Sequence, residues 1–260
     1  MNIPLYAEIL SHIKAHIYRQ RLALPHWKLR EGDIPNGHSP ALNDKQWDDF
    51  TVTQPWGGYD TTVWLRKSVT LPREFSGKPL SLVVDLPEGL LYVNGSPFQG
   101  VDQHHKEVLL TRRAKRGEQF HFAIQAYSGR KQKKSCFNSA FIAVLNPEAR
   151  ALYNSFVALQ ELEIILGLES NDAVQLRDIV RRTLDVFDAA SPESDEFTNV
   201  IGNAYGFLRS TLEAEFKTNV PGIVHLISQS HIDVVWLWTL RETKRKCART
   251  FSTALQLMNE

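Results

Sequence analysis

A change in hydrophobic periodicity along the chain constrains its fold more than any other feature of the sequence. Between about Trp27 and Asn146, apolar residues recur in short runs with a period of two, separated by Gly and Pro. The run Thr62–Thr70 alternates in this way, with Lys67 as an exception on its apolar side. Short strands at close spacing are typical of a β-sandwich, so we predict a β-sandwich domain over residues 25–146.

An Asn-Gly pair is the strongest local signal in this region. Asn94-Gly95 directly follows the β-rich run Leu90–Val93. A type I′ turn requires positive φ at both central residues, and Asn and Gly tolerate that conformation best. The sequence therefore predicts a tight hairpin at this point.

Helical periodicity precedes the sandwich region. Pro4 suits a first helical turn, and apolar residues then recur at every fourth position until Pro25 stops the pattern. The residues of this stripe are Leu5, Ile9, Ile13 and Ile17. We expect residues 1–24 to form an N-terminal helix.

Helical periodicity returns after the sandwich region, over residues 147–220. Asn146 can cap a helix that starts at Pro147 and ends at Gly167, and two further apolar stripes follow. The three stripes are Leu152, Phe156, Leu159, Leu162 and Leu166; Leu176, Val180, Leu184 and Phe187; and Phe197, Ile201, Ala204, Leu208 and Leu212. This pattern predicts a connector of three helices.

The last segment, residues 221–260, has the pattern of a strand followed by a helix. Ile223–Ser228 is a short apolar run bounded by turn signals, as in a buried strand. Thr239 and Glu242 match a capping box that starts the helix. The helix carries Cys247, Phe251, Leu255 and Met258 on one face. Strand, loop and helix make the first half of a βαβ unit.

Charge and cysteine content exclude some classes of partner and compartment. Lys and Arg total 30 against 29 Asp and Glu, so no global field attracts nucleic acid or anionic membrane. The basic clusters at 112–116 and 130–134 are interpreted as solvated loop ends. Two cysteines cannot form a disulfide framework, and no apolar run is long enough for a signal peptide or a membrane span. We predict a cytoplasmic location.

Candidate metal ligands occur in the loop before the last helix. Side chains two residues apart point to the same side of an extended backbone, so His231 and Asp233 can converge on one point. An imidazole nitrogen and a carboxylate oxygen are both ligands for zinc or another divalent transition metal. An isolated His-x-Asp is more often a surface pair or a hydrogen-bonded pair, and spacing alone leaves these alternatives open.

A longer pattern supports the metal interpretation. Val224–Glu260 resembles the opening of the catalytic domain in glycoside hydrolase family 38, the α-mannosidases. The matching parts are HID-x-x-WLW from His231, Glu242-Thr243, and the KCARTF run that starts at Lys246. Three upstream patterns resemble the β-sandwich that precedes this domain in bacterial and cytosolic members. They are Trp64-Leu-Arg, Tyr92-Val-Asn-Gly95 and Gly100-x-Asp102-x-x-His105.

The resemblance implies an activity and a metal site. Family members are retaining enzymes that release α-linked mannose and hold a zinc-type ion in the sugar pocket. His231 and Asp233 match the first two metal ligands, and Trp236 matches an aromatic residue in the subsite for the cleaved sugar. Gln229 and Thr239 depart from the residues that many members carry, but neither is a matched ligand.

The resemblance also implies what this chain does not supply. The family's nucleophile, acid/base carboxylate and last His ligand would lie beyond Glu260, so no catalytic residue is assigned within this chain. We therefore expect this chain to be inactive alone. Its expected partners are the remainder of its own catalytic domain and an α-mannoside oligosaccharide substrate. No nucleic-acid or membrane partner is expected, and homo-oligomerisation stays open.

The expected fold class is multidomain α+β. A jelly-roll or galactose-binding-like β-sandwich is followed by helices and by the first strand-helix unit of an incomplete α/β barrel. In the main alternative, the β-sandwich is a non-catalytic carbohydrate-binding or protein-interaction module. Its sugar platform would be Trp47, Trp56, Tyr59 and Trp64, although aromatic residues at alternating positions favour a core role. Leu237, Trp238 and Cys247 are also expected to be core residues.

Overall fold

The computed structural model describes residues 3–187, 194, 196–216, 225 and 231–259. The chain forms two compact units, one joining Met1–Arg19 to Leu145–Leu226 and the other joining Gln20–Val144 to Ile227–Glu260. This division differs from the four consecutive pieces expected from the sequence. The N-terminal helix belongs with the helical connector, and the C-terminal segment belongs with the sandwich. The strand expected over 223–228 falls almost wholly outside the described residues.

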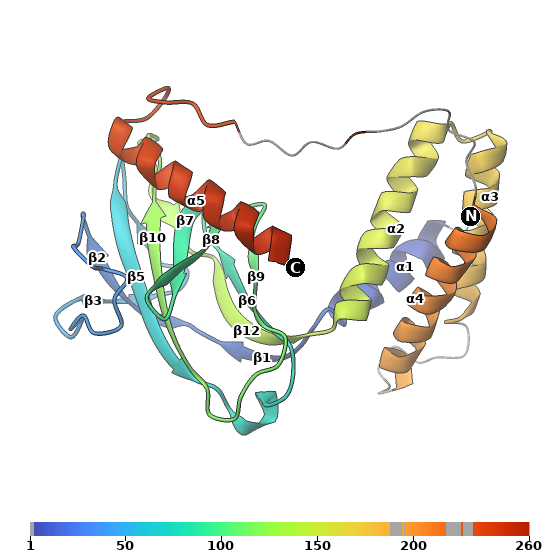
Figure 1. Cartoon of the computed structure of the whole chain (residues 1–260), viewed down its shortest axis with the longest axis horizontal. Coiled ribbons are helices and arrows are strands. Elements are labelled where there is room, and N and C mark those ends of the chain that lie inside the picture. Colours follow the sequence, from blue (N-terminus) through green and yellow to red (C-terminus); the bar gives the residue numbers. More distant parts are fainter. Residues whose placement is uncertain (1–2, 188–193, 195, 217–224, 226–230, 260) are drawn as a thin grey trace. The chain divides into compact units, whose positions relative to one another are not determined.

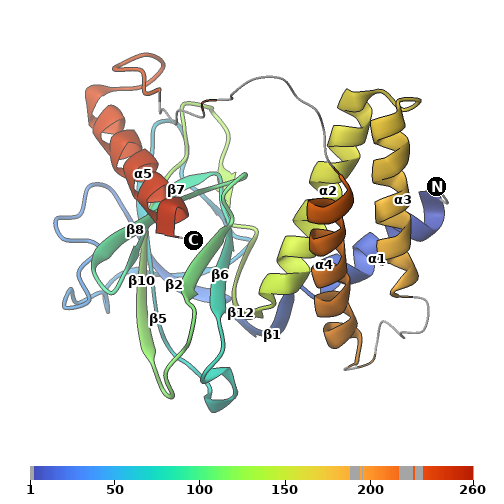
Figure 2. The ribbon, with the colours of Figure 1, turned by 45° about the vertical axis from the view of Figure 1, so that its right-hand side comes forward.

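The first unit is helical. Its helices are α1 (Ile3–Ala15), α2 (Pro147–Leu166), α3 (Asn171–Asp185) and α4 (Glu196–Glu215), and α2 packs against the other three (Figure 2). Asn146 Oδ1 accepts a hydrogen bond from the Ala149 amide at 3.0 Å, which confirms the predicted cap. The centres of the predicted stripes are buried, namely Leu152, Phe156, Leu176, Val180, Leu184, Phe197, Ile201, Ala204 and Leu208.

The N-terminal helix is shorter than the sequence pattern predicts. It ends at Ala15, and Tyr18–Ala23 forms strand β1, so the helix expected over residues 1–24 is wrong in its last third. Strand β1 lies beside β12 in a sheet, and the amide of Leu24 donates to the Ala140 carbonyl at 2.9 Å. Pairing with a partner distant in sequence therefore replaces the helix that was expected to continue after Ala15.

The second unit is a β-sandwich with one helix against it (Figure 1). One sheet has the order β1-β12-β6-β9, the other β3-β2-β5-β10-β7-β8, and β11 pairs with β4. The remaining elements are β2 (His26–Glu31), β3 (Asp48–Thr51), β4 (Pro55–Trp56), β5 (Thr62–Thr70), a 3₁₀ helix (Arg73–Phe75), β6 (Leu80–Asp85), β7 (Glu88–Val93), β8 (Ser96–Asp102), β9 (Glu107–Thr111), β10 (Gln119–Tyr127), β11 (Ser135–Cys136), β12 (Ser139–Leu145) and α5 (Leu240–Asn259). The β-sandwich prediction is confirmed.

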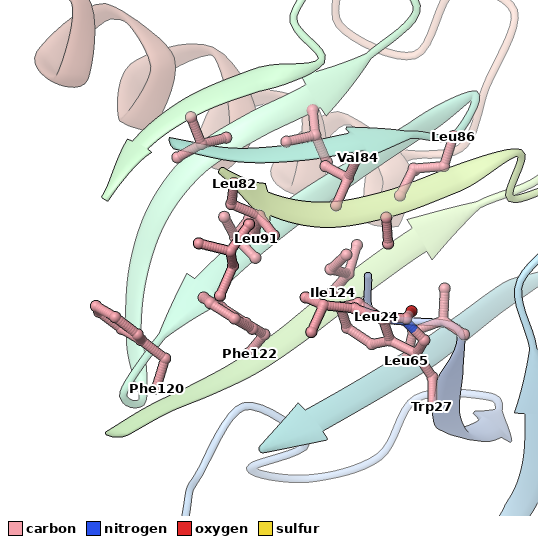
Figure 3. Packing of buried hydrophobic residues seen from close by; sticks show 14 of the residues in the cluster. Leu24, Trp27, Leu65, Leu82, Val84, Leu86, Leu91, Phe120, Phe122 and Ile124 are labelled. Atoms are coloured by element: carbon pink, nitrogen blue, oxygen red, sulfur yellow. The ribbon is translucent and has the colours of Figure 1, made fainter. Parts of the chain in front are cut away.

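The hydrophobic core fills the space between the two larger sheets. Figure 3 shows Leu82 and Val84 from β6 opposite Leu91, Phe122 and Ile124 from β7 and β10. Val63 and Leu65 of β5 are buried on the core side, as predicted, but alternation between partly buried and exposed residues appears only in the second half of the strand. The Asn94-Gly95 turn is also as predicted, with φ of 51° and 88° between β7 and β8.

The outer face of β5 is buried as well, which alternation did not predict. Trp64 packs with Trp47, and Arg66 Nη1 donates to the Gly37 and Ser39 carbonyls at 2.7 and 2.8 Å. A Cβ at Gly37 would lie 2.6 Å from the Trp64 ring, so only glycine allows this loop to approach so closely. The loop between β2 and β3 therefore covers a second apolar layer.

The aromatic residues considered as a sugar platform are mostly internal. Trp47, Trp56 and Trp64 are buried, which confirms the core interpretation for these three, whereas Tyr59 is 47% exposed. In the described part of the chain, no helix combines the length and apolar character needed to cross a membrane.

Helix α5 lies against strands β7 and β8 (Figure 1). The residues it buries there are polar or charged: Glu242, Thr243, Arg245 and Arg249. Its apolar residues Phe251, Leu255 and Met258 are 58%, 63% and 82% exposed. Cys247 is partly exposed and not a core residue. The helix therefore docks on the sandwich through its charged face.

Candidate functional site

The loop before α5 brings the two predicted metal ligands together. His231 Nε2 lies 2.9 Å from Asp233 Oδ1, and both side chains reach solvent. An ionised carboxylate can only accept hydrogen bonds, so this distance corresponds to an Nε2–H donating to Asp233. The two side chains therefore lie as close together as their spacing predicts, and they form a hydrogen-bonded pair.

Thr243, in the first turn of α5, holds this loop. Its Oγ1 accepts hydrogen bonds from the Val235 amide and from Trp238 Nε1, both at 3.1 Å. The side chain is buried, and α5 starts with the Glu242 amide donating to Thr239 Oγ1 at 3.3 Å, as half of the predicted capping box. Val235 has φ of 55°, which is unfavourable for a β-branched residue, so the Thr243 contacts stabilise a strained loop.

Leu237 and Trp238 differ from their predicted positions, whereas Trp236 is exposed. Trp236 is 64% exposed and meets Trp238 edge-on, with 5.7 Å between the ring centroids. Lys246 Nζ lies 4.4 Å from the centroid of the Trp238 ring. Leu237 is 59% exposed and Trp238 lines a cavity, so the prediction that both are core residues behind the site is wrong.

The cavity has a volume of about 510 Å³ and lies beside the His231–Asp233 pair. Pockets of roughly 300–1,000 Å³ are typical of small-molecule sites. Three parts of the second unit line it: the loop, α5, and the sandwich at β7, β8 and the turn that follows β8. The lining residues are Glu88, Gly100, Val101, Asp102, His105, His231, Ile232, Asp233, Trp238, Lys246, Arg249, Thr250, Thr253, Ala254 and Leu257.

The sandwich contributes an ordered Asp–His turn to this cavity. Asp102 Oδ1 accepts hydrogen bonds from the His104 and His105 amides at 2.7 and 2.8 Å. The His105 ring nitrogen Nδ1 lies 3.1 Å from both Asp102 carboxylate oxygens. Partial burial raises the pKa of Asp102, but the hydrogen bonds from His104 and His105 outweigh burial, and the net pKa is lowered.

The structure shows why the Gly-x-Asp-x-x-His pattern begins with a glycine, Gly100. Its amide donates to Thr253 Oγ1 at 3.0 Å, and a Cβ at this position would lie 2.8 Å from the same atom. It would also lie 3.1 Å from the Cβ and the carbonyl oxygen of Arg249. Glycine therefore permits the close contact between β8 and α5 that shapes one wall of the cavity.

Charged residues fix α5 to the sandwich. Glu88 Oε1 accepts hydrogen bonds from Lys246 Nζ at 2.7 Å and from Arg249 Nη2 at 2.6 Å. Buried Glu242 accepts from Arg245 and Arg249, and Arg245 also contacts Asp33. Several of these side chains belong to the Glu242-Thr243 and Lys246–Phe251 signature. Sequence analysis did not predict that they contact the sandwich.

The second basic cluster also contacts the loop. Arg130 donates to the Tyr59 hydroxyl through Nε at 2.9 Å and to the Leu237 carbonyl at 3.3 Å. Exposed Tyr59 is thus a partner of Arg130. Of the adjacent histidines His104 and His105, His105 lines the cavity and His104 does not.

The donor set of His231 and Asp233 fits part of a metal site. Bonds of about 2.1 Å in a tetrahedral site separate two ligands by about 3.4 Å, so the pair needs to open by only about 0.5 Å. Over the described residues, no group of three or more His, Cys, Asp or Glu side chains is placed to hold a metal. These two residues therefore supply donors of the right chemistry but not a complete coordination shell.

Comparison with known proteins defines the class of this chain. A family model described as "Alpha-mannosidase, jelly roll domain" matches residues 20–150, which is half of the chain and nearly all of the sandwich. The model of the "Glycosyl hydrolases family 38 N-terminal domain" matches residues 221–260, which include the His231–Asp233 loop and α5. The chain belongs to the α-mannosidases of glycoside hydrolase family 38.

Several curated α-mannosidases are similar to this chain. Human α-mannosidase 2C1 is 26% identical over 220 residues, covering 76% of this chain and 20% of the human protein. α-Mannosidase G of Dictyostelium discoideum is 26% identical over 235 residues, covering 82% and 21%. This chain thus spans about one fifth of the length of these relatives.

The solved structures that match are more distant. A β-glucuronidase from Bacteroides uniformis aligns with 47% of this chain and 18% of its own length, at 16% identity and a TM-score of 0.40. This likeness is too low to support any argument about function.

Proposed function

We propose that this chain supplies the β-sandwich and the first two metal ligands of a zinc-dependent, retaining α-mannosidase that acts on oligosaccharides. The observation that carries the proposal is the 2.9 Å approach of His231 and Asp233 beside a cavity of ligand size. The family 38 match across residues 221–260 supports the same roles for these residues.

The side chains in this region suit the binding of a sugar. His231 and Asp233 would hold a divalent ion, which when bound orients and polarises hydroxyl groups of mannose. Exposed Trp236 would offer its face to the apolar C–H surface of the sugar. Val235, which lies between Asp233 and Trp236, is held by the hydrogen bond from its amide to Thr243 Oγ1.

We assign no nucleophile or acid/base residue within these 260 residues. A retaining mechanism needs two carboxyl groups about 5–5.5 Å apart on either side of the glycosidic bond. We therefore propose that these 260 residues alone do not turn over substrate. A cytoplasmic location also stays a prediction, which fractionation of cells expressing the full-length gene product would test.

Metal analysis of the full-length gene product tests the proposal. The unchanged protein should contain a stoichiometric divalent ion and hydrolyse an α-mannoside, whereas Asp233→Ala should lose both. Asp48→Ala removes an exposed aspartate from β3 of the same unit and should retain both properties. Full metal content and activity in Asp233→Ala would show that the assignment of this ligand is wrong.

A further inference from the structure

The sandwich forms part of the cavity that contains the proposed metal ligands. Asp102 and His105 line it from the turn after β8, whereas His231 and Asp233 line it from the loop before α5. The two pairs come from segments more than one hundred residues apart, joined by the contact of α5 with β8. The cavity is therefore not built by the catalytic segment alone.

The Asp102–His105 turn is organised in a way that suits recognition of hydroxyl groups. The two backbone amides and the His105 ring nitrogen all hydrogen-bond to the Asp102 carboxylate. A carboxylate has about four acceptor sites, so capacity remains for a ligand hydroxyl. Because Nδ1–H of His105 donates to Asp102, its Nε2 is left to bind a further polar group.

The hydrogen bonds within this turn have a second consequence for binding. A side chain that is already ordered loses little conformational entropy when it binds a ligand. The cavity also offers the Trp238 indole as an apolar surface, and sugars commonly require one such surface together with a few fixed polar groups.

We infer that Asp102 and His105 bind hydroxyl groups of the sugar unit next to the one that is cleaved, so that the sandwich contributes to substrate specificity. This inference rests on the proposed function, because it assigns the cleaved sugar to His231 and Asp233. The chemical class of ligand is an α-linked mannose disaccharide or a longer oligosaccharide. The volume of about 510 Å³ is within the range that holds ligands of this size.

Comparison of two substrates in the full-length gene product tests the inference. One is the α-mannobiose that the unchanged enzyme cleaves fastest, and the other is an aryl α-mannoside, which has no second sugar. His105→Ala should lower kcat/KM for the mannobiose about tenfold or more and for the aryl mannoside less than twofold. Metal content should stay unchanged, because His105 is not a proposed ligand.

Two further variants separate recognition from folding. Asp102→Asn keeps an oxygen that can accept from both backbone amides, so the turn should persist while kcat/KM for the mannobiose falls selectively. His104→Ala removes the neighbouring imidazole, which does not line the cavity, and should leave kcat/KM for both substrates unchanged.

The possible outcomes distinguish the two proposals. Equal losses on both substrates, or no loss on either, in His105→Ala and Asp102→Asn would overturn the role of the sandwich while leaving the mannosidase proposal intact. If the unchanged gene product hydrolysed neither substrate, the proposed function would be wrong, and the inference that rests on it would fail as well.

Discussion

Arg249 on α5 donates a hydrogen bond to Glu88 on β7 at 2.6 Å, across 161 positions of the sequence. Arg249 also contacts buried Glu242, so one guanidinium joins the helix to the sandwich and to its own first turn. Glu242 precedes Thr243, which holds the His231–Asp233 loop. The charged face of α5 therefore connects the position of the candidate site to the fold of the sandwich.

We expect Glu242→Ala to destabilise the docking of α5. The substitution removes the buried carboxylate that Arg245 and Arg249 share, but Arg245 keeps Asp33 and Arg249 keeps Glu88, so the cost should be below the roughly 3–5 kcal/mol of a buried charge left without any partner. Hydrogen exchange of α5 amides should accelerate in the variant. Lys244→Ala, an exposed change on the same helix, should leave these rates close to those of the unchanged chain. Equal protection in Glu242→Ala would show that the network does not hold the helix.

Thr243→Val should release the loop before α5. Valine has nearly the same shape but cannot accept the hydrogen bonds from the Val235 amide and Trp238 Nε1. Leaving partly buried donors unsatisfied costs about 1–3 kcal/mol each, and Val235 would no longer be held at positive φ.

The loop can be monitored through the Trp238 indole N–H resonance and through amide exchange over residues 231–239. Both should change in Thr243→Val, whereas Thr243→Ser keeps the hydroxyl and should largely preserve them. Indistinguishable spectra for the two variants would contradict the role assigned to the hydroxyl.

Much of the fold could be predicted from local patterns. The core-side burial of Val63 and Leu65, the Asn94-Gly95 turn and the Asn146 cap each depend on neighbouring residues, and each is confirmed. The convergence of His231 and Asp233 is likewise a consequence of their spacing. Each of these features is determined by residues that are close together in the sequence.

The features that sequence analysis missed depend on long-range contacts. The apolar pattern of α5 did not indicate which surface its charged residues would contact; they face the sandwich because Glu88 and Asp33 lie there. Trp238 enters the cavity wall because Thr243 binds its indole nitrogen. Asp102 and His105 line the cavity, but the sequence shows them only as part of the Gly-x-Asp-x-x-His pattern, which does not indicate that they lie near His231 and Asp233.

The Asp102 turn should contribute to the pH dependence of stability. The folded-state pKa of Asp102 is lowered, so the stability it contributes is present above the unfolded-state pKa of about 4 and is lost as pH falls through the folded-state value. Urea unfolding of the unchanged chain should therefore weaken more between pH 7 and pH 3 than that of Asp102→Asn. If the free energy of unfolding fell equally in the two proteins, the ionised Asp102 carboxylate would not contribute to the stability of the folded state.

The apolar face of α5 should make these 260 residues self-associate. Phe251, Leu255 and Met258 expose contiguous apolar surface along one side of the helix, and such patches on soluble chains tend to be buried by association. Leu255→Lys places a charge in the centre of this surface and should shift sedimentation towards the monomer. Val174→Lys, at a similarly exposed position on α3, should have little effect. If the unchanged chain sediments as a monomer at all concentrations, or if Leu255→Lys associates as strongly as the unchanged chain, the exposed face of α5 does not drive association.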